Sequence, residues 1–230
     1  FFENHDHPRM VSKINPDGAY RCEIAKLLAM LQMTLKGTPF IYQGQELGMT
    51  NTPFASIDEL RDVESVNLYH KLMDEGKSSV EAFRTVLSGS RDHARTPMQW
   101  DASPNAGFTT GEPWIMVNPN YTQINAAQQV NDPDSVFCFY QQLLRLRKQH
   151  DVFLYGTYEL MLPDSEAIWA YRRTLGGRQA QVYCNFTTQG VPCETPREGL
   201  LLCNYNTVQA EILRPCECRV YLDPKGLLRS

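Results

Sequence analysis

The spacing of apolar residues changes along this chain, from a helical period near the start to strand-like alternation in the last third. After Gly18 an apolar residue recurs every three or four positions, at Ile24, Leu27, Leu28, Leu31 and Leu35. This spacing predicts an amphipathic helix over about residues 19–36. The short apolar segments at residues 1–4 and 39–43 lie on either side of it, and each predicts a buried strand. Together the three elements predict a βαβ unit with a right-handed crossover.

The pattern is looser between residues 50 and 130. Capping boxes at Ser56–Glu59 and Ser78–Glu81 predict two short helices there, and the rest predicts loop. A mostly irregular segment of this length usually serves a function. A second long helix is predicted over residues 133–149, and Arg145 and Arg147 lie near its end. We interpret these two arginines as solvated side chains that complement the helix dipole.

From Phe153 onward, apolar and polar residues alternate, which predicts β-strands. The candidate strands are separated by breakers and cover residues 155–162, 167–174, 179–186, 199–203 and 219–222. This part contains no cluster of titratable residues, so it predicts a small antiparallel β domain that packs against the preceding domain. The predicted fold class is α/β followed by all-β, with domains at residues 1–152 and 153–230.

The composition supports a globular protein and excludes some partners. With 230 residues, 42% of them hydrophobic, the chain can bury a sizeable core. Its net charge of −4 argues against binding to nucleic acid or to an anionic membrane surface. No apolar run reaches the roughly 18 residues of a membrane span. We therefore expect neither a nucleic acid nor a membrane as a partner.

The cysteines and the first residues indicate the cellular setting. The chain has seven cysteines, an odd number without the C-x-x-C spacing of a zinc site. They predict reduced structural thiols in the cytoplasm, with no metal site and no cofactor. No signal peptide is visible, and the chain starts with Phe1 inside a strand-like motif. We therefore expect it to be a piece of a longer protein.

Titratable residues follow directly on the first predicted strand, in the run Asn4-His5-Asp6. A neighbouring His and Asp can bind sugar hydroxyls, ligate a metal ion or belong to a nucleophilic triad. From these residues alone, none of the three roles is preferred over an ordinary surface turn. The irregular segment adds arginines, Trp100, Trp114 and Tyr121. Aromatic faces that stack on pyranose rings, and guanidinium groups that hold hydroxyls, are typical of sugar binding.

An ordered series of motifs makes the comparison with a known family specific. The motifs are F-x-x-N-H-D at residues 1–6, G-T-P-x-I-Y-Q-G at 37–44, G-M-T-N at 48–51, S-R-D-x-A-R-T-P-M-Q-W-D at 90–101, N-A-G-F-T-T-G-x-P-W at 105–114 and V-N-P-N-Y at 117–121. On these residues the chain resembles the C-terminal half of the α-glucosidase and oligo-1,6-glucosidase group within the α-amylase family of glycoside hydrolases. The resemblance spans nearly all of the chain.

The resemblance implies a fold and a set of site residues. The family fold is a (β/α)8 TIM barrel with a C-terminal β-sandwich, so residues 1–4 and 39–43 would be barrel strands seven and eight. Asp6 would be the carboxylate that stabilises the transition state by holding hydroxyls of the distorted sugar. His5 would bind the same sugar, Arg91 would hold its non-reducing end, and Glu64 would lie near the +1 subsite.

The resemblance also implies that part of the catalytic machinery lies elsewhere. Family members retain anomeric configuration through an Asp nucleophile and a Glu acid/base, and neither residue has a counterpart here. We therefore expect a part of a retaining exo-acting α-glucosidase that acts on short α-linked gluco-oligosaccharides. Alone the chain is expected to be inactive, with the missing N-terminal half of the barrel as its partner.

Two other readings stay open from the sequence. The enzyme could be a sucrose isomerase or another transglycosylase of the same group, because acceptor choice depends on residues outside this chain. The other reading is a non-catalytic relative, of the kind that forms the ectodomain of transporter heavy chains. The intact His5, Asp6 and Arg91 argue against this second reading. The preferred linkage does not follow from the sequence.

Overall fold

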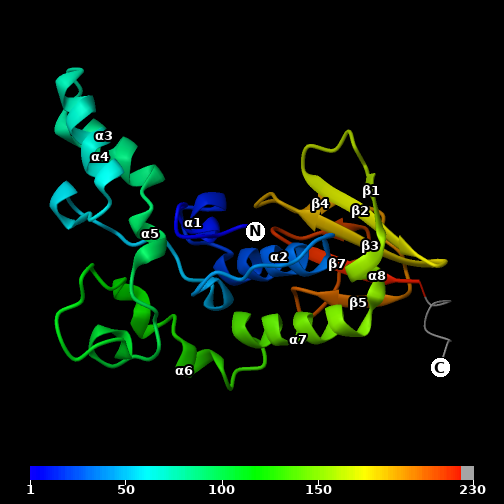
Figure 1. The fold of residues 1–230 in the computed structure, drawn as a ribbon. Coiled ribbons are helices and arrows are strands. Elements are labelled where there is room, and N and C mark those ends of the chain that lie inside the picture. Colours follow the sequence, from blue (N-terminus) through cyan, green and yellow to red (C-terminus); the bar gives the residue numbers. More distant parts are fainter. Residues whose placement is uncertain (224–230) are drawn as a thin grey trace. The chain divides into compact units, whose positions relative to one another are not determined.

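The computed structural model describes residues 1–223. The chain divides into two compact units. The first unit consists of Phe1–Ala19 and Ile41–Cys138, and the second consists of Tyr20–Phe40 and Phe139–Ser230 (Figure 1). This division follows contacts between residues, whereas the expected domains at 1–152 and 153–230 follow the change in apolar spacing along the sequence. Those domains therefore stay a prediction.

The first unit is built from short helices and long loops. Its elements are α1 (Met10–Ile14), η1 (Gln45–Leu47), η2 (Ile57–Glu59), α3 (Val63–Asp74), α4 (Ser79–Gly89), α5 (Asp92–Arg95), η3 (Pro104–Gly107), η4 (Pro119–Thr122) and α6 (Ala126–Gln129). The helix α7 (Val136–Gln149) starts in this unit and continues into the second one. Residues 50–130 thus form short helices joined by loops. The sequence predicted α4 and a short helix at Ser56, but it missed α3 and the shorter helices.

The predicted strands at residues 1–4 and 39–43 do not form, and neither does the βαβ unit. The backbone of both segments is irregular, and Phe1 and Phe40 are exposed. The physical reason is that a strand needs a second strand to accept and donate its backbone hydrogen bonds. None of the described strands pairs with either segment. A short apolar segment between breakers indicates that the segment can join a sheet. It does not show that a neighbouring strand is present to pair with it.

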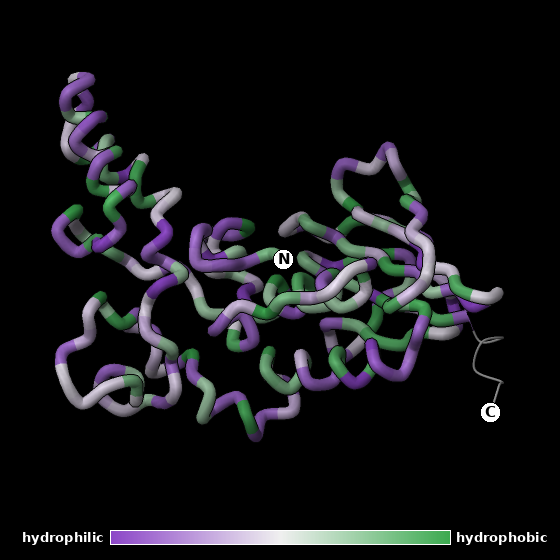
Figure 2. The backbone as a smooth tube through the Cα atoms, in the orientation of Figure 1, coloured by the Kyte–Doolittle hydropathy of each residue, from purple (hydrophilic) through white to green (hydrophobic). Residues whose placement is uncertain are grey.

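The capping boxes have different outcomes. At α4 the box is complete, because Ser78 Oγ accepts from the Glu81 amide and Glu81 Oε2 accepts from the Ser78 amide. At Ser56 the side chain makes no cap, and η2 is a single 3₁₀ turn. The hairpin of α3 and α4 mixes hydrophilic and hydrophobic residues along its length (Figure 2). Its buried side chains Leu72, Ala82 and Val86 form a core cluster with Phe54, Leu60 and Ile115 from the flanking segments.

The second unit contains the β domain that the alternating pattern predicted. One antiparallel sheet has the order β1-β2-β3-β7-β5, with β1 at Thr157–Met161, β2 at Ile168–Leu175, β3 at Arg178–Asn185, β7 at Cys218–Leu222 and β5 at Leu200–Cys203. These five strands confirm the five candidates. A second pair, β4 (Val191–Pro192) and β6 (Ile212–Leu213), was missed, because two residues are too few to show alternation.

The helix α2 (Arg21–Thr34) confirms the first long helix, but its apolar surface is wider than predicted. All residues from Leu27 to Thr34 are buried, so the C-terminal half has no solvent face. A helix that is covered all round cannot be recognised from a one-sided apolar stripe. α2 packs against β7 and against the short helix α8 (Asp151–Tyr155).

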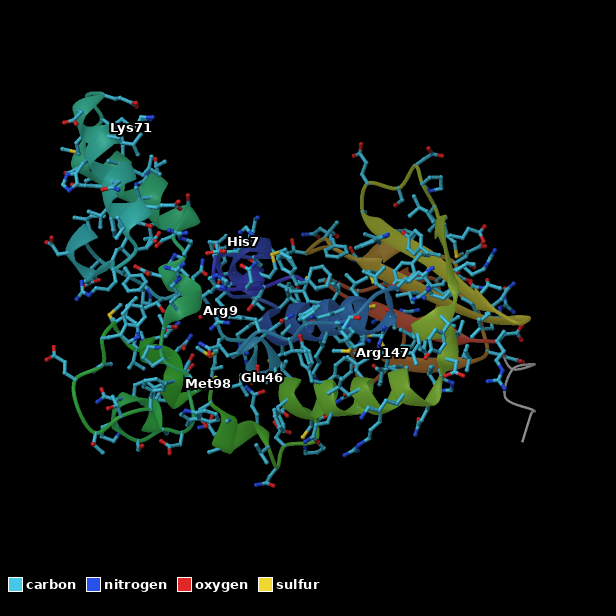
Figure 3. The ribbon with its side chains drawn as sticks, in the orientation of Figure 1. His7, Arg9, Glu46, Lys71, Met98 and Arg147 are labelled. Carbon is cyan, nitrogen blue, oxygen red and sulfur yellow. The ribbon has the colours of Figure 1, made fainter. Side chains whose placement is uncertain are left out.

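Two buried arginines hold the end of α2. Arg147, which Figure 3 labels, donates to the carbonyls of Met33 and Gly37 at 2.5 Å each. Arg173 donates to the carbonyls of Thr34, Gly156 and Thr157. Burial lowers the pKa of both guanidinium groups, and the negative end of the helix dipole offsets that cost.

The interpretation of Arg147 as a solvated helix end is therefore wrong, whereas Arg145 is exposed as predicted. All seven cysteines are free, as predicted. Within residues 1–223, the structure contains no helix with the length and apolar character that crossing a membrane requires.

We predict that Arg173→Met destabilises the protein by about 2–4 kcal/mol, because it leaves buried carbonyls at the end of α2 without a donor. The neighbouring Arg172 is partly exposed and pairs with Glu159 at 3.2 Å, so Arg172→Met serves as the control, with an expected cost below about 1 kcal/mol. Urea unfolding measures both. Equal costs for the two variants would contradict the role of Arg173.

Candidate functional site

The candidate site lies in the first unit and starts with a tight turn after Asn4. The side-chain oxygen of Asn4 accepts from the Asp6 amide at 2.8 Å, which closes an Asx turn over His5. Pro8 then prevents any regular continuation, and Arg9 is the N-cap residue of α1. The sequence thus places His5 and Asp6 on the outside of the turn, where both side chains are exposed.

A buried ion pair holds this turn in place. Arg9 and Glu3 are almost fully buried, and Arg9 Nη1 lies 3.1 Å from Glu3 Oε2. The other oxygen of Glu3 accepts from the Met10 amide at 2.8 Å. Arg9 also donates to the carbonyl of Gln43 at 2.8 Å and to that of Ala94 at 3.4 Å. The guanidinium group of Arg9, which Figure 3 labels, therefore joins the turn, the 41–44 segment and α5.

The Arg9 guanidinium needs a glycine beside it. Gly44 has φ +82°, which side chains rarely allow, and a Cβ there would lie 2.3 Å from the sulfur of Met49 and 3.1 Å from Arg9 Nη2. The ring of Tyr42 faces the guanidinium at 5.4 Å, and the Tyr42 hydroxyl donates to the Ala94 carbonyl at 3.1 Å. Burial raises the pKa of Tyr42, so its hydroxyl stays a donor.

All four side chains that the sequence assigned to the site lie together. Asp6 Oδ2 is 3.3 Å from His5 Nε2, and Asp6 Oδ1 is 3.6 Å from Arg91 Nη1. Glu64 Oε2 is 3.0 Å from Arg91 Nη2. The Asp6 side chain remains 45% exposed and that of Glu64 77% exposed, so both carboxylates can reach a ligand.

The structure adds Asp62 and Arg95, which the sequence analysis missed as site residues. Arg95 Nη2 lies 3.3 Å from Asp6 Oδ1, and Arg95 Nε donates to the His5 carbonyl at 2.9 Å. Asp62 lies under both arginines and is nearly fully buried. One sequence signal was available for Asp62. Aspartate directly before the helical run at 63 is a typical N-cap, and its side chain does accept from the Ser65 amide.

Two buried polar residues of α5 hold the segment that carries Asp62. Asp92 Oδ2 accepts from the amides of Arg61 and Asp62 at 2.6 and 2.9 Å. His93 Nδ1 accepts from the Thr52 amide at 3.2 Å, which leaves its Nε2 proton for the Leu87 carbonyl at 2.8 Å. Burial lowers the pKa of His93, in agreement with this neutral form.

The chemistry of the cluster suits hydroxyl groups better than a metal ion. Within residues 1–223, no three His, Cys, Asp or Glu side chains are placed to hold a metal. The site instead offers two exposed carboxylates, one imidazole and the guanidinium groups of two arginines whose side chains are each 25% exposed. Carboxylates accept from hydroxyls while guanidinium groups donate to them, so the arrangement can hold neighbouring hydroxyls of one ring.

Comparison with known proteins identifies the family. The catalytic-domain model of alpha-amylase matches residues 1–156, and the chain belongs to the alpha-amylase family. The resemblance found in the sequence is thereby confirmed. An oligo-1,6-glucosidase from Parageobacillus thermoglucosidasius is 47% identical over 233 residues. That match covers 96% of this chain and 42% of the relative, so the chain spans less than half the length of this relative.

Solved structures agree in fold and differ in activity. A trehalose-6-phosphate hydrolase from Bacillus licheniformis has a TM-score of 0.90 at 40% identity. An isomaltulose synthase from Protaminobacter rubrum has a TM-score of 0.89 at 42% identity. In both comparisons 96% of this chain and 42% of the other chain are covered. Relatives of this similarity thus include both hydrolases and synthases.

We predict that Glu3→Gln lowers the free energy of unfolding by about 3–5 kcal/mol, because it leaves the buried Arg9 cation without its counter-charge. The matched control is Glu75→Gln, which removes an exposed ion pair with Lys71 whose charged atoms are 3.8 Å apart. Its cost should stay below about 1 kcal/mol. Urea unfolding compares the two variants, and a Glu3→Gln cost as small as that of the control would refute the anchoring role.

Proposed function

We propose that this chain supplies the transition-state-stabilising carboxylate of a retaining, exo-acting α-glucosidase that acts on short α-linked gluco-oligosaccharides. The observation that carries the proposal is the contact of Asp6 with His5, Arg91 and Arg95 on an exposed turn. Support comes from the oligo-1,6-glucosidases among the curated relatives. In this proposal the partner of the site is a small carbohydrate.

Each site residue has a role that its geometry allows. Asp6 accepts from hydroxyls of the distorted sugar, whose ring gains positive charge as the glycosidic bond breaks. His5, whose Nε2 lies beside the Asp6 carboxylate, binds the same sugar. Arg91 holds the non-reducing end. Glu64, which is highly exposed, contacts the sugar in the +1 subsite.

The two residues that form and break the covalent intermediate belong to another part of the proposed enzyme. Retention needs an Asp nucleophile and a Glu acid/base about 5 Å apart, and Asp6 alone cannot serve as both. The proposed fold is a (β/α)8 barrel with a C-terminal β-sandwich, in which residues 1–4 and 39–43 become strands beside the N-terminal half. The seven free thiols support a cytoplasmic location.

A transglycosylase of the sucrose isomerase type is the second candidate, supported by the isomaltulose and trehalulose synthases among the similar structures. Analysis of the products from sucrose and from isomaltose separates the two activities. A non-catalytic relative is less well supported, because the side chains of His5, Asp6 and Arg91 are all present and in contact.

We predict that Asp6→Asn in the full-length protein lowers kcat by about 100-fold or more while the melting temperature stays unchanged. The lost interaction is strongest in the transition state, and the exposed Asp6 contributes little to the fold. Asp17→Asn, at an exposed aspartate in the turn after α1, is the control that keeps its activity. A folded Asp6→Asn variant with wild-type kcat would refute the assignment.

We also predict that the 230-residue chain alone hydrolyses no p-nitrophenyl α-glucoside, because it lacks the nucleophile and the acid/base. Adding the N-terminal half as a separate polypeptide should restore measurable hydrolysis. The release of p-nitrophenol measures both reactions. Activity from the chain alone would show that the catalytic carboxylates lie within residues 1–230.

A further inference from the structure

Asp62 binds both arginines that contact Asp6. Arg91 approaches it side-on, with Nη2 2.5 Å and Nε 3.1 Å from Asp62 Oδ1. Arg91 Nε is also 3.1 Å from Oδ2, and Arg95 Nη1 lies 3.5 Å from Oδ1. One edge of the Arg91 guanidinium is therefore occupied, and Nη1 is the group that remains directed at Asp6.

The Asp62 carboxylate is itself fixed. Its side chain is 4% exposed, and Ser65 donates to Oδ2 through its hydroxyl at 2.9 Å and through its amide at 3.3 Å. Burial would raise the pKa of Asp62, but the hydrogen bonds from Arg91 and Ser65 outweigh it and the pKa is lowered. Asp62 therefore stays negatively charged at neutral pH, and its bond to Arg91 raises the pKa of that guanidinium.

We infer that Asp62 is a positioning residue for the reaction. It orients Arg91 and Arg95 and offsets one of their two positive charges, so that the negative charge of Asp6 is less compensated by the arginines and can stabilise the sugar. This inference rests on the proposed glucosidase function, and it deepens that function by adding a residue that does not touch the substrate. The geometry separates two roles, because Asp62 is buried while Asp6 is half exposed.

The physical reason lies in the number of charges. Arg91 and Arg95 carry two positive charges, and the carboxylates of Asp62, Asp6 and the highly exposed Glu64 face them. Without the charge of Asp62, Arg95 has Asp6 as its nearest counter-ion, and Arg91 has only Asp6 at 3.6 Å and the highly exposed Glu64 at 3.0 Å. They would then compensate the carboxylate that must stabilise a developing positive charge on the sugar, in a partly buried site where Coulomb energies are large.

Four forms of the full-length protein test this: wild type, Asp62→Asn, Asp62→Asn/Arg95→Gln and the control Asp58→Asn. Asp58 is an exposed carboxylate four residues away whose side chain has no place in the site. The readouts are kcat and KM on p-nitrophenyl α-glucoside and the melting temperature. Calorimetry adds the affinities for neutral glucose and for 1-deoxynojirimycin, an amino analogue of glucose that is positively charged when protonated.

In Asp62→Asn we expect kcat to fall about tenfold or more while KM changes less than about threefold. Affinity for protonated 1-deoxynojirimycin should fall with kcat, and affinity for glucose should stay within about threefold of wild type. The double variant removes one positive charge and should recover at least about threefold of both losses. Asp58→Asn should behave as wild type.

Several results would overturn the inference. One is a wild-type kcat in Asp62→Asn. Another is an equal loss of affinity for glucose and for protonated 1-deoxynojirimycin that the double variant does not recover. Such equal losses indicate a role in folding alone. If Asp62→Asn does not fold, the single variant Arg95→Gln tests the inference instead. This variant should bind protonated 1-deoxynojirimycin more tightly than the wild type does. Unchanged or weaker binding would contradict the inference. An inactive wild type would overturn the proposed function, whereas calorimetry would still test the charge relation.

Discussion

The buried pair of Arg9 and Glu3 is the constraint on which the candidate site depends. A buried guanidinium is costly unless its charge and its N–H groups are satisfied, so its partners must stay in place. Those partners are a carboxylate before the turn, the Gln43 carbonyl and the Ala94 carbonyl in α5. Because Arg91 and Arg95 flank Ala94, the same interaction that fixes the Asp6 turn also sets the position of both arginines relative to it.

The second unit also contains buried arginines, but there they cap the end of a helix. Arg147 and Arg173 are buried among carbonyls at the end of α2, and no carboxylate within residues 1–223 pairs with either of them. The helix dipole supplies the negative charge there, which suffices for a structural cap. At the candidate site Arg91 and Arg95 have carboxylates as partners instead, and each of these two side chains is 25% exposed. Burial separates the arginines that stabilise the fold, which include Arg9 with its carboxylate partner, from Arg91 and Arg95, which are partly exposed and can bind a ligand.

The sequence predicted the parts of this protein that depend on local patterns. The alternating strands of the β domain and the capping box at Ser78 were found in this way, whereas the grouping of Asp6 with Arg91 came from the resemblance to a family. Arg147 was misinterpreted, because basic residues near a helix end look the same whether they are solvated or buried. Asp62 was missed since its partners lie about 30 residues away in α5, and the strands at 1–4 and 39–43 failed because pairing is not local.

The most direct test of the central claim is a crystal structure of the full-length protein with an unreacted α-glucoside bound. The account predicts that the Asp6 carboxylate accepts hydrogen bonds from sugar hydroxyls at about 2.5–3.0 Å. Arg91 should keep its Nε and Nη2 groups on Asp62 and offer only Nη1 to the sugar. The account would be contradicted by a sugar bound away from Asp6. It would also be contradicted if Arg91 left Asp62 and bound the ligand through Nε and both Nη groups.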